Sequence, residues 1–457
     1  MTATAARPTA KEGRARRRPG ARTLSLLALV LLLASVSVAI TIGPARVSVP
    51  DVWAVVASRF GGGESGLTPI REGIVWELRL PRTVLAAVCG AGLAVCGVVM
   101  QSLLRNPLAD PFVLGVSSGA STGAVAVVVL GLGGGALSIS TGAFLGALVS
   151  FGLVLLLSHS LGGTTDRVVL SGVAGMQLFS ALTSFVVMFA ADAEQTRGIL
   201  FWLLGSLSGA TWTDVWACLA VLVVALVVCG ARAVQLDAFA FGAESAAALG
   251  VSVARTRLIL LSVTALLTAA LVSAAGAIGF VGLVLPHAAR ALVGTLHGRL
   301  LPVAALSGAV FLVWVDTLAR TVLAPQEIPV GVVTSLIGVP AFVLIMYRTR
   351  RPHDRPRHSP RRPGGAPGRA GHEVGGRAAH PRRRRPGGAH RQHGGAHRAQ
   401  RLRQVDAAAA AGRAAHAERR HRHRGRLHPR RTGPPRDGPA ARRGRAARGH
   451  RHRPDRP

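Results

Sequence analysis

Long apolar stretches, most of them without a charged residue, recur along the first 350 residues of the chain. Most are close to 20 residues long, the length that an α-helix needs to cross the hydrocarbon core of a membrane. This pattern excludes an ordinary soluble globular domain and predicts an all-α, polytopic membrane protein. The ten predicted spans cover residues 23–42, 82–104, 112–132, 138–158, 167–190, 213–231, 258–276, 277–293, 301–323 and 329–347. A shorter apolar piece, residues 198–210, predicts a partial or re-entrant helix.

Basic residues between Lys11 and Arg22 precede the first span, as they do in a signal peptide. The apolar run that follows is about 20 residues long, which exceeds the usual hydrophobic region of a signal peptide, and further spans come after it. We therefore expect an uncleaved first helix.

The seventh and eighth spans lie in one uncharged stretch between Arg257 and Arg290. At 1.5 Å per residue this stretch reaches about 50 Å, slightly short of two full crossings. With two crossings, 16 of the 23 Lys and Arg residues in the first 350 fall on the cytoplasmic side. That distribution satisfies the positive-inside rule and predicts ten spans with both termini cytoplasmic. Gly276, Gly282 and Pro286, with Gly279, predict that the eighth span is broken or tilted, which is tolerated where a helix lines an enclosed cavity.

Composition divides the chain at about residue 350. The formal net charge is +34, but residues 351–457 hold 31 of the 54 basic residues, all of them Arg, and only 6 of the 20 acids. The same segment has four large aliphatic residues (Val374, Leu402, Val405, Leu427) and no aromatic residue. It cannot bury enough apolar surface to offset its ordering entropy, so we expect a disordered basic tail. The high pI therefore does not indicate a nucleic-acid-binding fold.

Ionisable residues are rare inside the predicted spans. The relay of acids and histidines typical of proton- or sodium-coupled carriers is absent from the sequence of these spans. Asp316 is the main exception, and its spacing predicts an i,i+4 ion pair with Arg320. On the fifth span, Gln177, Ser180 and Ser184 share one helix face and line a polar pathway or form interhelical hydrogen bonds.

No catalytic or metal-binding pattern stands out in residues 1–350. The four cysteines (Cys89, Cys96, Cys218, Cys229) lie in apolar runs without metal-type spacing and are interpreted as buried thiols. His159, His287 and His297 are isolated in sequence near cytoplasmic ends, and we find no Ser/His/Asp cluster and no phosphate-binding loop there. The sequence predicts a transporter or channel component that is not an enzyme, has no cofactor or metal, and takes its energy from a partner.

Five segments, in order and with compatible spacing, carry a family resemblance. They read RLPRT at 79–83, GAGL at 90–93, MQSLLRNPLADPFVLGVSSG at 100–119, GFVGLVLPHAAR at 279–290 and EIPVGVVTSLIG at 327–338. This set resembles the permease subunits of ATP-binding-cassette (ABC) importers for iron-siderophores and vitamin B12, the FecCD-like transmembrane family. The resemblance covers about residues 20–350, and the family's ten-helix topology agrees with the count of spans above.

The resemblance implies site roles for particular residues. Family members dock a binding protein through outward arginines, which match Arg79, Arg82 and Arg320; the alternative is that these arginines only anchor helix ends. The segment 241–250 resembles the coupling helix that contacts the ATPase, or is a simple connector. Its matching residues are Gly242, Ala243, Glu244, Ala248, Leu249 and Gly250. The start of the fifth span matches the cytoplasmic gate, and that span lines the central pathway of a permease dimer. The gate and pathway residues are Thr164, Thr165, Gln177, Ser180 and Ser184.

The spans, the charge and the composition divide the chain into a basic cytoplasmic tail (1–22), a ten-helix permease domain (23–350) and the disordered basic tail (351–457). We expect a permease in the plasma (inner) membrane that moves an iron-siderophore inward, driven by a separate ATPase. The expected partners are that ATPase, a second permease as homodimer or heterodimer, membrane lipid, and a substrate-binding lipoprotein or periplasmic protein, with no nucleic acid. A cobalamin or haem importer, a secondary transporter and a basic nucleic-acid-associated membrane protein remain open as alternatives.

The tail has the composition of GC-rich DNA translated out of frame. One codon choice that the sequence 396–408 permits, read from its second base, gives Leu-Ile-Gly-Pro-Asn-Gly-Ser-Gly-Lys-Ser-Thr-Leu, which contains a P-loop. We therefore interpret 351–457 as a frameshifted remnant of a neighbouring ATPase gene; as written, the chain has no P-loop. The competing interpretation is a genuine basic tail that contacts anionic lipid or nucleic acid.

Overall fold

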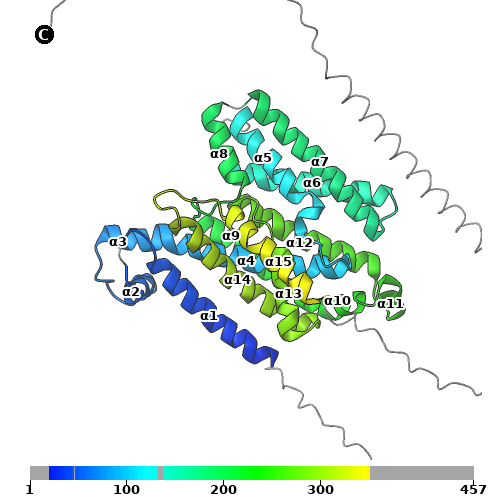
Figure 1. Ribbon diagram of the computed structural model, residues 1–457, viewed down its shortest axis with the longest axis horizontal. Coiled ribbons are helices and arrows are strands. Elements are labelled where there is room, and N and C mark those ends of the chain that lie inside the picture. The colour runs from blue at the N-terminus through cyan, green and yellow to red at the C-terminus, as the bar shows by residue number, and fades with distance from the viewer. Residues whose placement is uncertain (1–19, 46, 132–136, 191, 350–457) are drawn as a thin grey trace, which may run out of the picture. The chain divides into compact units, whose positions relative to one another are not determined.

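The computed structural model describes residues 20–45, 47–131, 137–190 and 192–349, and within them the chain is helical without a strand (Figure 1). The predicted tail 351–457 and most of the basic segment 1–22 lie outside the described residues. The elements are α1 (Ala21–Thr41), α2 (Val49–Arg59), α3 (Pro69–Gly73), the π-helical η1 (Ile74–Arg79), α4 (Leu80–Leu103), the 3₁₀-helical η2 (Pro111–Leu114), α5 (Val116–Leu130), α6 (Ile139–Ser160), α7 (Thr165–Ala190), α8 (Ala193–Leu203), α9 (Trp212–Ala231), α10 (Ala233–Phe239), α11 (Ala243–Ala248), α12 (Val253–Ala275), α13 (Val281–Val293), α14 (His297–Thr321) and α15 (Val330–Thr349).

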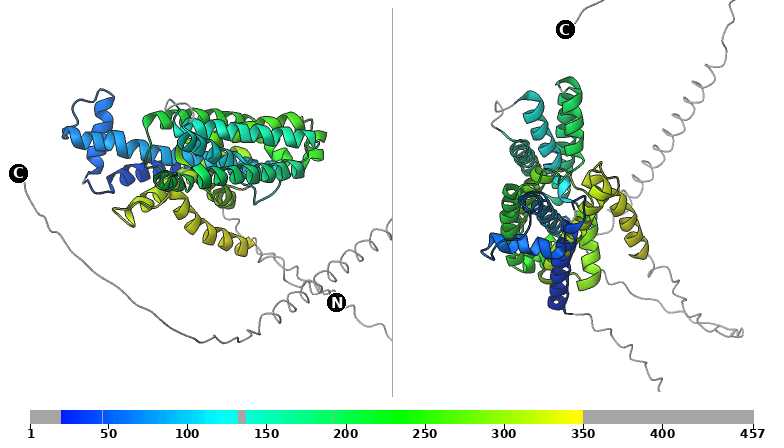
Figure 2. Two further views of the ribbon diagram at one scale, coloured as in Figure 1. Left: turned by 90° about the horizontal axis from the view of Figure 1, so that it is seen from above. Right: turned by 90° about the vertical axis from the view of Figure 1, so that its left-hand side faces the viewer.

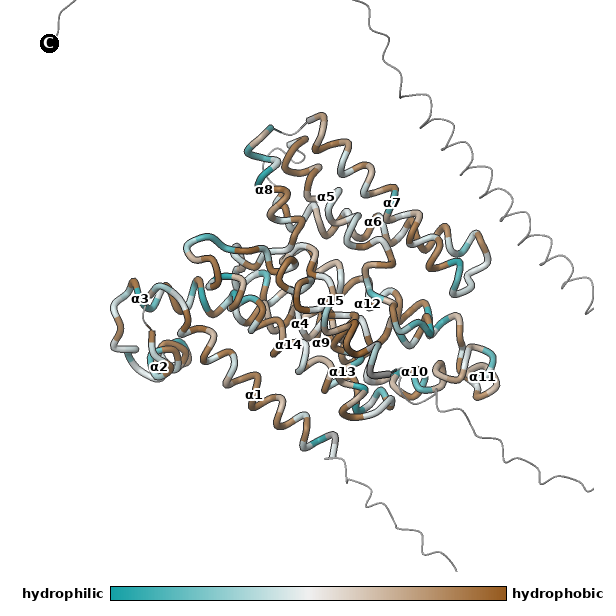
Figure 3. Tube along the Cα trace, in the orientation of Figure 1, coloured by the Kyte–Doolittle hydropathy of each residue, from teal (hydrophilic) through white to brown (hydrophobic). Residues whose placement is uncertain are grey.

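Each of the ten predicted spans has a helix in the structure: α1, α4, α5, α6, α7, α9, α12, α13, α14 and α15. Among the described residues, seven helical segments are long and apolar enough to cross a membrane, and α5, α13 and α15 are shorter apolar helices. Hydrophobic residues run along these helices, and hydrophilic residues gather in the segments that join them (Figure 3). The prediction of an all-α, polytopic membrane protein is confirmed.

Helix α4 lies at the centre of the bundle and contacts α14, α13, α12 and α9. Most of its apolar window, 94%, is buried, against 22% for α1. Glycines allow the close approach: a Cβ atom added at Gly90 would lie 2.1 Å from the carbonyl oxygen of Gly308, and one at Gly97 would lie 1.9 Å from that of Gly282. Small residues at these crossings bring the helix backbones into direct contact. Such close van der Waals packing stabilises helix association in a membrane, where the hydrophobic effect does not drive helices together.

Helices α5, α6 and α7 lie side by side (Figures 1 and 2). Gly123 on α5 faces Gly142 on α6, so that a Cβ at Gly123 would lie 2.0 Å from the Gly142 carbonyl oxygen. Glycines therefore mark a close helix crossing here as well.

The eighth predicted span, 277–293, begins with a non-helical segment, at the glycines that predicted a break. Helix α12 ends at Ala275, followed by Gly276 at φ +68°, and α13 begins only after Phe280, also at φ +68°. The predicted partial helix at 198–210 is present as α8 but begins five residues earlier. Asp192 and Gln195 form a capping box that fixes its start, and Gly205 at φ +82° follows its end.

Candidate functional site

Two opposite ends of the bundle carry the residues singled out by the sequence. The Arg82 end is where α4 begins and α14 ends; the α11 end is where α4 ends and α14 begins. Both ends are assembled by contacts between segments that are distant in sequence.

At the Arg82 end, Arg82 and Asp316 form a buried ion pair between α4 and α14. Arg82 Nη2 lies 2.9 Å from Asp316 Oδ1, and Arg82 Nε donates to both carboxylate oxygens at 3.0 and 3.2 Å. The side chains are 11% and 2% exposed. The predicted Asp316–Arg320 pair is also present, but more loosely, with Arg320 Nε 3.8 Å from Asp316 Oδ2. Asp316 therefore holds two arginines from different helices.

The same network reaches the loop before α15 and the end of α1. Arg82 Nη1 lies 2.9 Å from Glu327 Oε1, and Glu327 is 35% exposed. Arg320 Nη2 donates to the carbonyl oxygen of Ala39. Arg79 is buried and donates to the carbonyl oxygens of Ile40 and Ala45 at 2.8 and 2.9 Å.

The structure thus brings the three sequence-predicted docking arginines to one end of the bundle. Their guanidinium groups donate to acceptors within the chain, as the anchoring alternative expects, and their docking role stays a prediction. The most exposed member of the network is Glu327.

At the α11 end, the segment 241–250 forms a short helix flanked by two glycines in the positive-φ region. Gly242 has φ +105° and Gly250 has φ +83°, conformations that L side chains rarely adopt. Ala246 faces inward and is buried, whereas Phe241 and Leu249 are 76% and 71% exposed. The predicted coupling residues therefore form a short helical projection, and the segment presents the apolar side chains of Phe241 and Leu249 outward.

The predicted gate and pathway residues lie at α7: Thr164 directly precedes the helix, Thr165 begins it, and the others are on its exposed face. Arg257 on α12 donates to the carbonyl oxygen of Gly163 at 3.0 Å, which places Thr164 and Thr165 near the first turn of α12. Further along, Gln177, Ser180 and Ser184 are exposed. They share the open part of α7 with large apolar residues: Leu170, Val173, Leu178, Leu182, Phe185, Met188 and Phe189. This surface has no cover within the described part of the chain.

The structure contains a Ser/His/Asp cluster near the α11 end. The expectation from the sequence that there is no such cluster is therefore wrong. Ser102 Oγ lies 2.6 Å from His297 Nε2, and His297 Nδ1 lies 2.6 Å from Asp237 Oδ1. The three residues come from α4, α14 and α10, with no spacing that sequence inspection could detect. His297 is 4% exposed and is therefore a buried link, where the sequence suggested an isolated interfacial residue.

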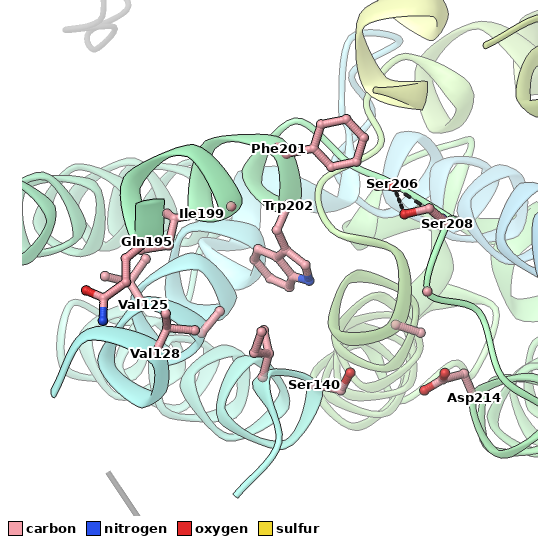
Figure 4. Close-up of a pocket in the computed structure, with 15 residues that line it drawn as sticks. Val125, Val128, Ser140, Gln195, Ile199, Phe201, Trp202, Ser206, Ser208 and Asp214 are labelled. Atoms are coloured by element: carbon pink, nitrogen blue, oxygen red, sulfur yellow. Dashed lines mark hydrogen bonds between the residues drawn. The ribbon is translucent and has the colours of Figure 1, made fainter. Parts of the chain in front are cut away.

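A cavity of about 390 Å³ lies among α5, α6, α8 and the segment after α8 (Figure 4). The indole of Trp202 projects into it, with Val125, Val128 and Ile199 on the surrounding walls. Asp214 lies at its edge, but that carboxylate already accepts from the amide and hydroxyl of Thr211. The cavity is a mainly apolar hollow without a catalytic set of side chains.

Metal-binding groups of three or more His, Cys, Asp or Glu are absent from the described residues. The four cysteines are buried and unpaired by disulfides.

Comparisons with known proteins agree with this arrangement. The profile of the FecCD transport family matches residues 29–348. The chain is 42% identical over 336 residues to the cobalamin import system permease protein BtuC of Halobacterium salinarum, covering 71% of this chain and 88% of that protein. It is 41% identical over 281 residues to the hemin transport system permease protein HmuU of Yersinia pestis, covering 60% and 84%. The vitamin B12 import system permease protein BtuC of Escherichia coli is 40% identical over 287 residues, covering 62% and 86%.

A solved structure agrees with the fold. A metal-chelate type ABC transporter in an inward-facing conformation superposes with a TM-score of 0.64 at 30% identity, covering 72% of this chain and 99% of that one. The chain therefore belongs to the FecCD transport family, as a permease subunit of an ABC importer rather than an enzyme.

Proposed function

We propose that this permease imports a metal chelate across the plasma membrane, with a ferric siderophore as the predicted cargo. A permease of this class works with an ATPase and a second permease subunit, which supply the energy and complete the pathway. Relatives named for cobalamin and hemin transport support the chelate class and make cobalamin and haem the alternative cargoes.

The observation that carries the proposal is the exposed face of α7. Gln177, Ser180 and Ser184 lie there among apolar side chains, and the face has no charged residue between Arg167 and Ala190. When two permeases pair through such faces, the wall between them is neutral, weakly polar and without metal ligands. A wall of this kind suits a bulky chelate whose metal is already enclosed by its own ligand.

The orientation that we propose places the α11 end in the cytoplasm, together with both termini. Arg105, Arg255 and Arg299 lie near the α11 ends of α4, α12 and α14, as the positive-inside rule requires. The gate threonines, Thr164 and Thr165, then lie at the inner mouth of the pathway. The segment 242–250 is then available to the ATPase, and its exposed Leu249 would fill an apolar groove of that subunit.

The Arg82 end is external in this orientation, where a binding protein docks. Glu327 is the outward partner of Arg82, so an acidic side chain of the binding protein could replace it without disturbing the buried Arg82–Asp316 pair. Arg79 and Arg320 would then act by holding this surface in shape. Charged pairs of this kind set the orientation and rate of docking more than its affinity.

Uptake into proteoliposomes tests the cargo. The permease, its ATPase and its binding protein are reconstituted, and iron-55 ferric siderophore, haem and labelled cobalamin are supplied separately with and without ATP inside. We expect ATP-dependent uptake of the ferric siderophore. Uptake of cobalamin or haem alone would select that alternative, and ATP-independent uptake of any of them would overturn the importer proposal.

A further inference from the structure

Ser102, His297 and Asp237 form a continuous hydrogen-bonded chain across the α11 end, here named the His297 link. His297 contributes both ring nitrogens, each 2.6 Å from its partner, and its backbone N–H also donates to Asp237 Oδ1 at 2.9 Å. Ser102 Oγ also lies 2.8 Å from the carbonyl oxygen of Val98 on α4, which is an alternative acceptor for its single hydroxyl proton.

The His297 link joins three elements with different surroundings. Ser102 belongs to the last turn of α4, the most buried span, and His297 is the first residue of α14. Asp237 belongs to α10, which is separated from the projecting α11 by only three residues. Arg105, just beyond α4, lies next to Gly242, since a Cβ added there would be 3.3 Å from its Nη1. Helix α10 therefore connects the ends of α4 and α14 to the projecting α11.

The cluster has the residue types of a hydrolase triad but not its accessibility. His297 is 4% exposed, so its ring is closed off from a substrate, and its two ring nitrogens contact Ser102 and Asp237. The arrangement is suited to coupling the movement of α10 to that of α4 and α14, since hydrogen bonds in a low-dielectric interior are strong and directional.

We propose that His297 is a positioning residue of the transport cycle, which passes a displacement of α10 and α11 on to α4 and α14. This inference rests on the proposed contact between α11 and the ATPase. The imidazole ring of His297 is planar, and its two nitrogens lie at a fixed distance from each other. The ring therefore holds its partners, Ser102 and Asp237, at a fixed separation. A flexible amide side chain at the same position would let α10 and α11 move while α4 and α14 remain in place.

The test measures movement directly. Nitroxide labels are attached at Phe189→Cys on α7 and Leu323→Cys after α14, both exposed and near the ends of their helices, while the four native cysteines are buried. Electron-spin distances are then recorded for the full permease–ATPase complex in nanodiscs, with ADP and with ATP plus vanadate. We expect a nucleotide-driven distance change that falls at least twofold in His297→Gln, with ATPase binding and ATP hydrolysis within twofold of the parent.

Ser102→Ala is the second variant, since it removes one oxygen and is tolerated even if His297→Gln does not fold. His159→Gln, at an exposed histidine near the end of α6, is the control and should leave the distance change intact. An equal distance change in the parent, His297→Gln and Ser102→Ala would overturn the inference, as would no change in the parent. The proposed ATPase contact is tested separately with a variant of α11 itself. Loss of ATPase binding in that variant supports the contact, and retention contradicts it.

Discussion

Arg82 and Asp316 are 234 positions apart along the chain, yet Arg82 Nε donates to Asp316 Oδ1 at 3.0 Å across the interface of α4 and α14. The pair is almost fully enclosed, and Arg320 approaches the same carboxylate from the next turn of α14. One carboxylate thus pairs with two guanidinium groups at the end of the bundle. Removing it would leave two buried cations with only Glu327 as a carboxylate partner among the described residues.

The Asp316→Asn variant tests this arrangement. Breaking a buried pair by removing one partner typically costs about 3–5 kcal/mol, because the remaining charge is uncompensated. We expect a clearly lower unfolding temperature for the detergent-solubilised protein by tryptophan fluorescence. The control is Glu72→Gln, which breaks the more exposed Arg59–Glu72 pair and should cost less than about 1 kcal/mol. Equal unfolding temperatures for Asp316→Asn and the parent would contradict this account.

The Gly97→Ala variant tests the close crossing of α4 and α13. The added Cβ would meet the Gly282 carbonyl oxygen at 1.9 Å, and backbone on both sides must shift to relieve the overlap. We expect lost yield of folded protein in size-exclusion chromatography, or an unfolding temperature several degrees lower. Gly152→Ala on α6 is the matched control, because no atom lies within 4 Å of its added Cβ. There, the removal of a helical glycine should be neutral or stabilise by about 0.5–1 kcal/mol.

Asp110, in the segment between α4 and α5, predicts a dependence of stability on pH. Burial raises the pKa of Asp110 to about 6, although its Oδ1 accepts from the Phe112 amide. The folded state therefore holds this proton more tightly than the unfolded chain does. Its contribution to stability is present below about pH 4 and is lost as the pH rises through about 6.

The Asp110→Asn variant should remove that dependence, since the amide oxygen still accepts from Phe112. We expect the parent to lose on the order of 1–3 kcal/mol between pH 4 and pH 7 relative to the variant, from thermal unfolding at each pH. Asp166→Asn, at an exposed carboxylate on the first turn of α7, serves as control. A parallel pH profile for the parent and Asp110→Asn would exclude a role for this carboxyl.

The Leu249→Asp variant tests the projection formed by α11. A carboxylate in place of the exposed leucine would be desolvated in an apolar groove, so we expect at least a tenfold loss of ATPase retained in co-purification. Ile70→Asp places the same charge at a comparably exposed apolar residue of α3, near the Arg82 end, and should retain the ATPase. Retention by both variants would remove α11 from the ATPase contact.

Hydrophobic length and charge placement predicted the helices well, because each span must satisfy its backbone hydrogen bonds internally and so reads as one apolar run. The break before α13 was likewise predicted, because glycine readily adopts the positive φ at which a helix ends, as Gly276 does. What the sequence could not supply is the partner of each buried polar residue. Asp316 was assigned to Arg320 by local spacing, whereas its closer partner lies on α4. Ser102, His297 and Asp237 carry no local pattern, since only the packing of α4, α14 and α10 brings them together.

The glycine contacts of α4 restrict how this permease can change shape. Backbone meets backbone at Gly90–Gly308 and Gly97–Gly282, where even one added Cβ would overlap the facing carbonyl oxygen. Helices α4, α13 and α14 should consequently turn as a single block during a cycle of import. Relative displacement is left to elements with looser surroundings, above all α7, and the gate would open by tilting that helix against an unyielding frame.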